Sequence, residues 1–192
     1  AATKGRSAEE IMGLIDAGLS HIGENYVQQA KEKHAQLKGR AMFHCIGHLQ
    51  SNKIKQAVEI FDMIQTLDSE KTLAEIEKRC AAINKVMPVC IEVNIAKEPQ
   101  KHGCMPKDII RLAKAVVDAQ HCELRGIMTM GPVDKDLRPH FQEARKIFRM
   151  LQELFPKQHI DTLSMGMSDS YQAAIEEGAT MVRIGSGLFE DI

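Results

Sequence analysis

The chain has 192 residues, of which 44% are hydrophobic and 27% charged, a composition typical of a globular protein. Its 25 Lys and Arg residues are balanced by 26 Asp and Glu residues, so no bulk charge favours nucleic-acid or membrane binding. The absence of Trp, with only two Tyr and six Phe, also argues against an aromatic platform for single-stranded nucleic acid.

The five cysteines are odd in number and form no CxxC pair. A disulfide framework or a thiolate zinc site is therefore not expected, and a reducing, cytoplasmic location is. No apolar run approaches the roughly 18 residues of a membrane span, and no secretory signal is visible.

Short apolar runs alternate with helical patterns along the chain. We expect eight strands, at Ala1–Lys4, His21–Glu24, Phe43–Gly47, Met63–Asp68, Val89–Ile95, Leu124–Met130, Thr162–Gly166 and Met181–Gly185. Seven helices fall between them, and an eighth is expected to begin near Leu188. The alternation predicts an α/β fold with a parallel sheet, and eight units favour a (β/α)8 TIM-type barrel. An open sheet is the alternative if the two weakest strands, His21–Glu24 and Thr162–Gly166, do not form.

The helix patterns carry recognisable ends and faces. Ser7 and Glu10 predict a capping box, Gly18 predicts the end of that helix, and Ser69 begins another helix in the same way. Pro106 lies near the first turn of a helix whose apolar face is expected to contain Ile109, Leu112, Ala113, Val116 and Val117. The last long helix has an apolar face of Phe141, Ala144, Ile147, Phe148, Leu151 and Leu154. No flexible linker divides these elements, so residues 1–192 are expected to form one domain.

Polar residues and glycines follow every expected strand, at the end where barrels of this kind carry their function. Two of these strand ends, in "MGMSDS" and "RIGSGLF", combine serines with glycines that let a phosphate approach the backbone. Neither has the spacing of a P-loop or of a dinucleotide fingerprint. The sequence therefore predicts a phosphate site at the last two strands.

Lys4 is expected to face this phosphate site, because the first strand of a barrel closes against the last. A neighbouring cation, Arg183, and partial burial would favour the neutral amine that Schiff-base chemistry requires. A lysine amine beside a phosphate cradle indicates pyridoxal 5'-phosphate (PLP) as the cofactor.

Several longer stretches match a known family in its own order. They are "AATK", "HIGENYVQQA", "FHCIGHLQSNKIK", "IQTLDS", "VNIAKEPQKHG", "LRGIMTMGP" and "LSMGMSDSYQAAIEEGATMVRIGSGLF". On these residues the chain resembles the PLP homeostasis proteins, also called the YggS or proline synthetase co-transcribed family. These are single-barrel relatives of the N-terminal domain of alanine racemase.

The resemblance implies a PLP-binding barrel of the alanine racemase N-terminal kind (PLP fold type III). Compared with the family pattern, a truncated first strand and no leading helix are expected in this sequence. By position, Lys4 is similar to the lysine that holds PLP as an internal aldimine, and Arg183 to the residue that faces the pyridine nitrogen. The resemblance also implies further cofactor contacts from Asn25, Ser168, Gly185 and Ser186. A guanidinium has no acceptor for a hydrogen bond from a protonated ring nitrogen, so the ring would stay unprotonated and would be a weaker electron sink.

The family's role implies a carrier that buffers or delivers PLP without catalysis of its own, with PLP-dependent apoenzymes as recipients. The alternative is a PLP-dependent amino-acid racemase or another PLP enzyme. Racemisation needs acid–base groups on both faces of the substrate, and in the racemases one is a tyrosine from a second domain. The chain ends at "GLFEDI", and Tyr26 and Tyr171 lie at expected helix starts, so we expect no such group. We expect no nucleic-acid or membrane partner, and a monomer or weak dimer.

Other residues that could suggest chemistry have simpler interpretations. His44 and His48 have the spacing of a helical metal pair, but they straddle a strand end, so no metal site is expected. His48 is expected either to border the cofactor pocket or to be a surface residue. Cys45 and Cys90 lie inside strands and are expected to be unreactive. The methionines near strand ends are expected to line the barrel interior, namely Met128, Met130, Met165 and Met167.

Overall fold

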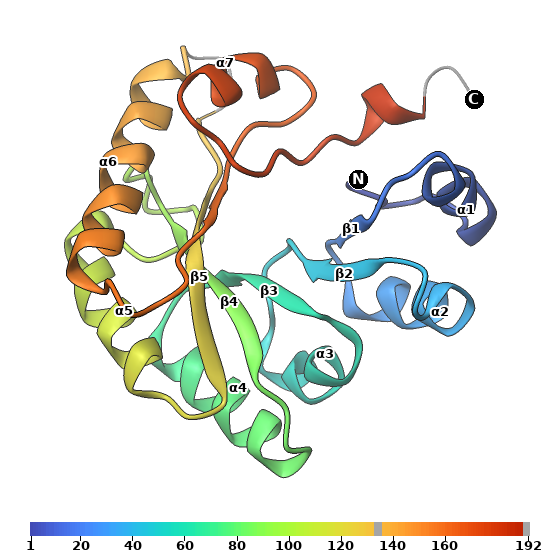
Figure 1. Ribbon diagram of the computed structural model, residues 1–192, viewed down its shortest axis with the longest axis horizontal. Coiled ribbons are helices and arrows are strands. Elements are labelled where there is room, and N and C mark those ends of the chain that lie inside the picture. Colours follow the sequence, from blue (N-terminus) through green and yellow to red (C-terminus); the bar gives the residue numbers. More distant parts are fainter. Residues whose placement is uncertain (133–135, 190–192) are drawn as a thin grey trace.

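The chain forms a curled parallel sheet with helices on its outer side (Figure 1). The structure, a computed structural model, describes residues 1–132 and 136–189. Within these ranges six strands pair side by side in chain order: β1 (His21–Glu24), β2 (Met42–Cys45), β3 (Met63–Leu67), β4 (Met87–Val93), β5 (Cys122–Thr129) and β6 (Thr162–Ser164). The two strands with the weakest sequence signals, β1 and β6, are among them.

Seven α-helices of the described ranges alternate with these strands. They are α1 (Ala8–Asp16), α2 (Val27–Leu37), α3 (Ile54–Ile60), α4 (Glu70–Ala82), α5 (Ile109–Asp118), α6 (Arg138–Leu154) and α7 (Tyr171–Glu176). Short 3-10 turns cover Ser51–Lys53, Pro106–Asp108 and Ser186–Leu188. The last of these stands where an eighth helix was expected, and the remainder of that expected helix, from residue 190, lies outside the described residues.

Two segments expected as full strands, Ala1–Lys4 and Met181–Gly185, form only isolated bridges, so this expectation was wrong. Met181 bridges to Ser164 of β6, and Ala2 bridges to Gly23 of β1. Their regular pairing is short because Gly5, with φ +75°, turns the chain after the first segment, and Gly185 leaves the extended conformation in the last.

These two segments nevertheless close the sheet. The amide of Ala2 donates to the carbonyl of Ile184 at 2.7 Å, and the amide of Thr3 donates to the carbonyl of Gly23 at 3.0 Å. Eight chain segments therefore complete a circle, and the fold is a TIM-type barrel closed by two irregular segments. The open-sheet alternative is wrong.

The predicted helix ends are confirmed at α1 and α4. Ser7 Oγ accepts from the amide of Glu10 at 3.2 Å, and Glu10 Oε2 accepts from the amide of Ser7 at 2.7 Å, which completes the capping box. Gly18 follows α1 with φ +101°. Ser69 caps α4 by accepting from the amide of Thr72 at 3.2 Å.

The apolar faces of α5 and α6 pack onto the outer side of the sheet in a cluster that extends across the fold. Leu154, the last residue of α6, is the exception, with 50% of its surface exposed. Met128 lines the barrel interior as expected, whereas Met165 is buried in the outer apolar cluster. Met130 and Met167 follow the strand ends and are 44% and 45% exposed, so for these three residues the expectation was wrong. Among the described residues, no helix is both long and apolar enough to cross a membrane.

Alternate residues of the strands face the interior of the barrel. Val89 and Ile91 of β4 belong to the outer apolar cluster, so Cys90 and Glu92 between and beside them face inward. Cys90 packs there with Met63 and Met128. The interior also receives several polar side chains, which matter for the site.

Candidate functional site

The carboxyl ends of the parallel strands meet at one mouth of the barrel. The last described segment of the chain, drawn in red, passes this region and runs towards α1 and the N-terminus (Figure 1). The residues predicted for the site follow β1, β6 and the two closing segments, so the fold gathers them at this mouth.

Ser168, Gly185 and Ser186 come together as predicted. The hydroxyl of Ser168 accepts from the amide of Gly185 at 3.4 Å and lies 3.4 Å from the hydroxyl of Ser186. These distances are longer than the usual 2.5–3.0 Å of a hydroxyl hydrogen bond. Two hydroxyls and a backbone N–H group are therefore close together but weakly engaged, and they can donate to an anion.

The loop that carries Ser168 is fixed by a close approach to α7. Gly166 has φ +90°, and a Cβ atom there would lie 2.5 Å from the Cβ of Ala174. The carbonyl of Gly166 accepts from the amide of Arg183 at 3.0 Å, which ties this loop to the last segment. We call Ser168, Gly185 and Ser186 the anion cradle. Glycine at position 166 allows the loop of Ser168 to meet the segment that carries the other two residues.

Lys4 lies at the rim but not in the surroundings expected for it. Its side chain is exposed, and its Nζ atom is 5.6 Å from the centre of the Tyr26 ring. The expected partial burial against Arg183 was therefore wrong. The preceding residue, Thr3, is buried instead, and its carbonyl accepts from Lys33 Nζ at 2.7 Å. Lys33 also pairs with Glu24 at 2.5 Å, so the backbone that presents Lys4 is firmly held.

Arg183 is buried inside the barrel. Its Nη1 donates to Ser164 Oγ at 2.7 Å and its Nη2 donates to the carbonyl of Thr129 at 3.0 Å. Burial lowers the pKa of Arg183 to about 10, so the guanidinium keeps its charge at neutral pH. Two of its donors are thus committed to the protein, and they fix the plane of the guanidinium.

The hydrogen bonds that start at Arg183 continue across the interior. Ser164 Oγ donates to Gln65 Oε1 at 2.7 Å, and Gln65 Nε2 lies 2.9 Å from His44 Nδ1. Because an amide nitrogen only donates, His44 Nδ1 accepts and its Nε2 carries the proton. That Nε2 lies 2.9 Å from His21 Nδ1. We call this series, from Arg183 through Ser164, Gln65 and His44 to His21, the interior chain.

Burial, with a smaller contribution from His21, lowers the pKa of His44 to about 3. His44 is therefore neutral, as the interior chain requires. Its two ring nitrogens are both engaged within the barrel, so it is not the metal partner of His48 that its sequence spacing suggested.

Asn25 follows β1 and is half-buried. It lines a hollow together with Tyr26, Gly47 and His48. A Cβ atom at Gly47 would lie 2.4 Å from the carbonyl oxygen of Asn25, so glycine is required where these two loops touch. His48 is exposed and borders this hollow, so the expectation of a surface residue is confirmed, and its place beside the cofactor stays a prediction.

Glu92 of β4 is a buried carboxylate with no counterpart in the predicted site. Its Oε2 has no hydrogen-bond partner among the described residues. Burial, with the negative charge of Asp68, raises the pKa of Glu92 to about 7, and Arg183 opposes this shift. At least one polar atom inside the barrel therefore has no hydrogen-bond partner among the described residues.

Burial raises the pKa of Cys45 to about 11 and that of Cys90 to about 12, in agreement with the expectation that these thiols are unreactive. Sequence reasoning missed the roles of Gln65, Ser164 and Glu92. The available signal was a polar residue in the middle of an apolar strand, as in "MIQTL", "TLSMG" and "CIEVN".

Comparison with known sequences identifies a family and several relatives of this chain. The sequence model of the family described as "Alanine racemase, N-terminal domain" matches residues 1–191. A protein named pyridoxal phosphate homeostasis protein, from Pasteurella multocida, is 38% identical over 195 residues, which cover 98% of this chain and 84% of the relative. The protein of that name from Escherichia coli K12 is 38% identical over 196 residues, covering 98% and 83%.

Comparison with solved structures finds the same fold in related proteins. PipY of Synechococcus elongatus without PLP matches with a TM-score of 0.93 at 33% identity, covering 98% of this chain and 90% of PipY. The same protein with PLP bound matches with a TM-score of 0.87 at 31% identity and the same coverage. An alanine racemase of Clostridium difficile matches at 15% identity with a TM-score of 0.72, covering 96% of this chain and 48% of the racemase, which shows a shared fold alone.

Proposed function

Since the chain belongs to the alanine racemase N-terminal domain family, with the pyridoxal phosphate homeostasis proteins as relatives, we propose that it binds PLP and takes part in PLP homeostasis. The observation that carries the proposal is the arrangement at the barrel mouth: a lysine amine, a cradle of hydroxyl and amide donors, and a buried arginine linked to that cradle. PipY, which shares the fold at 31% identity, has been solved with PLP bound.

The described residues fit the chemical groups of PLP. Ser168, Gly185 and Ser186 offer three donors to a phosphate, and their mutual distances of 3.4 Å leave these donors available. The buried guanidinium of Arg183 offers a cation to the ring nitrogen, and the exposed amine of Lys4 is accessible to the aldehyde. When bound, PLP supplies an aldehyde that condenses with amines and a ring that can withdraw electrons.

In this proposal each residue has one role. Lys4 holds the cofactor covalently, the cradle orients its phosphate, Asn25 borders it, and Arg183 faces the pyridine nitrogen. Because Arg183 is a charged guanidinium with donors only, it cannot accept a hydrogen bond from a protonated ring nitrogen and would donate to the unprotonated nitrogen instead. This weakens electron withdrawal by the ring and supports storage or delivery over catalysis. Residues 1–192 would act as one PLP-binding domain.

The test of binding compares Lys4→Ala with Lys31→Ala, which removes an exposed lysine of α2. The wild-type protein and Lys31→Ala should show the visible absorption of lysine-bound PLP, and borohydride reduction should attach the cofactor to the peptide that contains residue 4. Lys4→Ala should lose both signals. If Lys4→Ala kept them, the assignment of Lys4 would be wrong.

The non-catalytic role has its own test. The PLP-loaded protein is incubated with L-alanine in D2O, and deuterium incorporation at Cα is followed by NMR. Exchange no faster than with free PLP would support the carrier. Exchange well above that rate would instead support the alternative, an amino-acid racemase or another PLP enzyme.

We also propose PLP-dependent apoenzymes as recipients, in the cytoplasm, with the carrier as a monomer or weak dimer. The burial of all five free cysteines is consistent with a reducing compartment. Activation of a PLP-free transaminase by the loaded carrier, faster than by an equal concentration of free PLP, would support direct delivery. An equal or slower rate would contradict it.

A further inference from the structure

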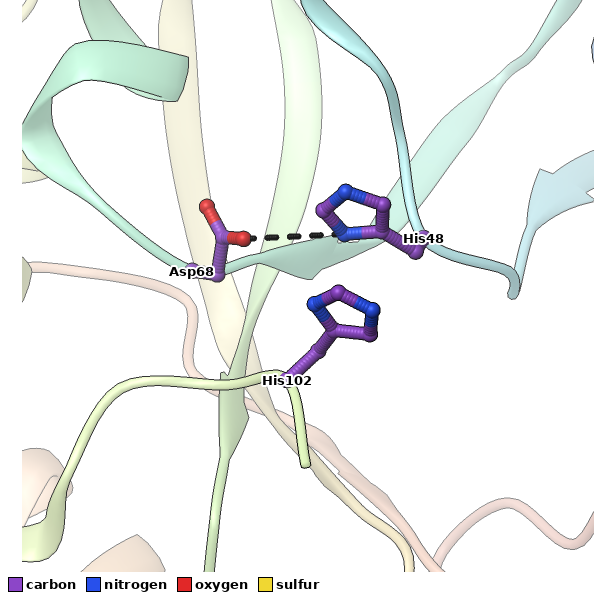
Figure 2. A group of neighbouring side chains, drawn as sticks. All are labelled: His48, Asp68 and His102. Carbon is purple, nitrogen blue, oxygen red and sulfur yellow. Dashed lines mark ion pairs between the residues drawn. The ribbon is translucent and has the colours of Figure 1, made fainter. Parts of the chain in front are cut away.

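Three side chains from separate loops gather at the barrel mouth (Figure 2). His48 follows β2, Asp68 follows β3, and His102 lies in the loop after β4. Their nitrogen and oxygen atoms that could bind a metal lie within 4.8 Å of one another. In the circle of eight segments, β3 is four positions away from the segment that carries Gly185, so this group is separate from the cradle.

Two imidazoles and one carboxylate form a donor set that Zn²⁺ and similar transition-metal ions prefer. Two donors on a tetrahedral zinc ion, with bonds of about 2.0–2.1 Å, are about 3.4 Å apart. His48 Nδ1 and Asp68 Oδ2 are 3.8 Å apart, so a small movement brings this pair to the separation that the ion requires.

The carboxylate of Asp68 is already oriented for such a role. Its Oδ1 accepts from Ser69 Oγ at 3.0 Å and from Thr72 Oγ1 at 2.8 Å, both at the start of α4. These hydrogen bonds leave Oδ2 directed at His48. Hydrogen bonds to the second oxygen of a ligating carboxylate are the usual support of metal ligands.

The two histidine rings must separate for both to bind. Their centroids are 3.8 Å apart and their planes differ by 12°, so the rings are stacked. An ion bound by an imidazole lies in the plane of that ring, so two parallel rings cannot share one ion. Both residues are exposed at the rim, so rotation of either side chain towards solvent can separate the rings.

The lysine next to His102 in the sequence has its ammonium group engaged away from the three possible ligands. Lys101, the residue before His102, has its Nζ atom 3.2 Å from Glu98 Oε1 and donates to the carbonyl of Gly131 at 3.2 Å. Its ammonium is thereby engaged elsewhere in the loop region.

We propose that His48, Asp68 and His102 bind one divalent transition-metal ion, with Zn²⁺ as the best match to the donors. Three protein ligands leave the fourth position of a tetrahedral ion for water or for a small anionic ligand at the barrel mouth. None of its three ligands belongs to the cradle or is the cofactor lysine, so we expect the ion to bind with or without PLP.

The experiment titrates Zn²⁺ into the metal-free full chain by calorimetry, with and without PLP. We expect one ion per chain in both states. His102→Ala and Asp68→Asn should weaken binding by at least about 10–100-fold, the range seen when even an outer-shell partner is lost. Thr72→Val, which removes only a hydrogen bond to Asp68, should weaken it about tenfold. The control is His159→Ala, which removes an exposed histidine 3.1 Å from Asp161 and should change nothing.

Co²⁺ provides a second readout, because a tetrahedral site with histidine ligands absorbs visible light far more strongly than hexaaqua Co²⁺ does. Circular dichroism confirms that each variant is folded, and PLP absorption confirms that the cradle is intact. Zn²⁺ affinity that is unchanged in His102→Ala and Asp68→Asn would overturn the proposal. So would the absence of binding to the wild-type chain, or loss of binding in His159→Ala.

Discussion

The interior of the barrel and the rim of its mouth differ in how closely their polar groups are hydrogen-bonded to one another. Inside, the interior chain from Arg183 to His21 is made of hydrogen bonds of 2.7–2.9 Å between polar side chains. At the rim, Ser168 and Ser186 touch only at 3.4 Å, and Lys4 is exposed. The polar side chains of the interior are hydrogen-bonded to one another without a ligand, whereas the donors at the rim remain available to one. Substitutions inside should therefore act on folding, and substitutions at the rim on binding.

The largest effect is expected from Gln65→Leu, at the centre of the interior chain. Leucine fills a similar volume but leaves the O–H of Ser164 without an acceptor and His44 Nδ1 without a donor, although Ser164 Oγ still accepts from Arg183. Each buried unpaired group costs about 1–3 kcal/mol, so for the two groups together we expect a loss of about 2–6 kcal/mol in the free energy of unfolding. Urea denaturation followed by circular dichroism measures it, because the chain has no Trp.

The matched control is Gln36→Leu on the exposed side of α2, which should stay within about 0.5 kcal/mol of the wild type. Equal stability of the two variants would show that the interior chain does not contribute to folding.

The next effect is a dependence on pH. The folded pKa of His44 is about 3, whereas its ordinary value is 6.5. Between these values the unfolded chain binds a proton that the folded chain does not, so His44 lowers stability as the pH falls below 6.5. The expected slope is about 1.4 kcal/mol per pH unit. Stability measured at pH 7 and pH 5 should therefore fall less in His44→Gln than in the wild type.

Glu92 acts in the opposite direction, because its raised pKa of about 7 makes the folded chain bind a proton first as the pH falls. It is present in both proteins of the pair, so the difference between their slopes isolates His44. Parallel slopes would contradict the neutral, buried state of His44.

The smallest effect on folding is expected at the rim. Ser186→Ala should change the free energy of unfolding by less than about 0.5 kcal/mol, because its hydroxyl makes only a long contact. If the cradle holds a phosphate, the same change removes a hydrogen bond to a charged group and should weaken PLP binding about tenfold. Ser20→Ala, an exposed serine just before β1 at the other end of the barrel, serves as control. Equal PLP affinities in the two variants would separate Ser186 from the cofactor.

Local sequence patterns were sufficient for much of the fold. Strand and helix periodicity depends on neighbours a few residues apart, and so does the capping box of Ser7 and Glu10; these features were predicted and are present. The meeting of Ser168 with Gly185 and Ser186 was also predictable, because parallel strands bring their carboxyl ends to one edge. Roles for these residues, and for Lys4, Asn25 and Arg183, remain predictions.

What the sequence by itself determined was the order of strands and helices and the end of the barrel at which the polar residues collect. Only the tertiary structure decided how the barrel closes, where the interior chain runs, and that His48 pairs with Asp68 and His102 instead of His44. The physical reason is that these features are lateral contacts between different strands. Whether a polar side chain is exposed or hydrogen-bonded across the barrel depends on register and sheet curvature, which local periodicity does not specify.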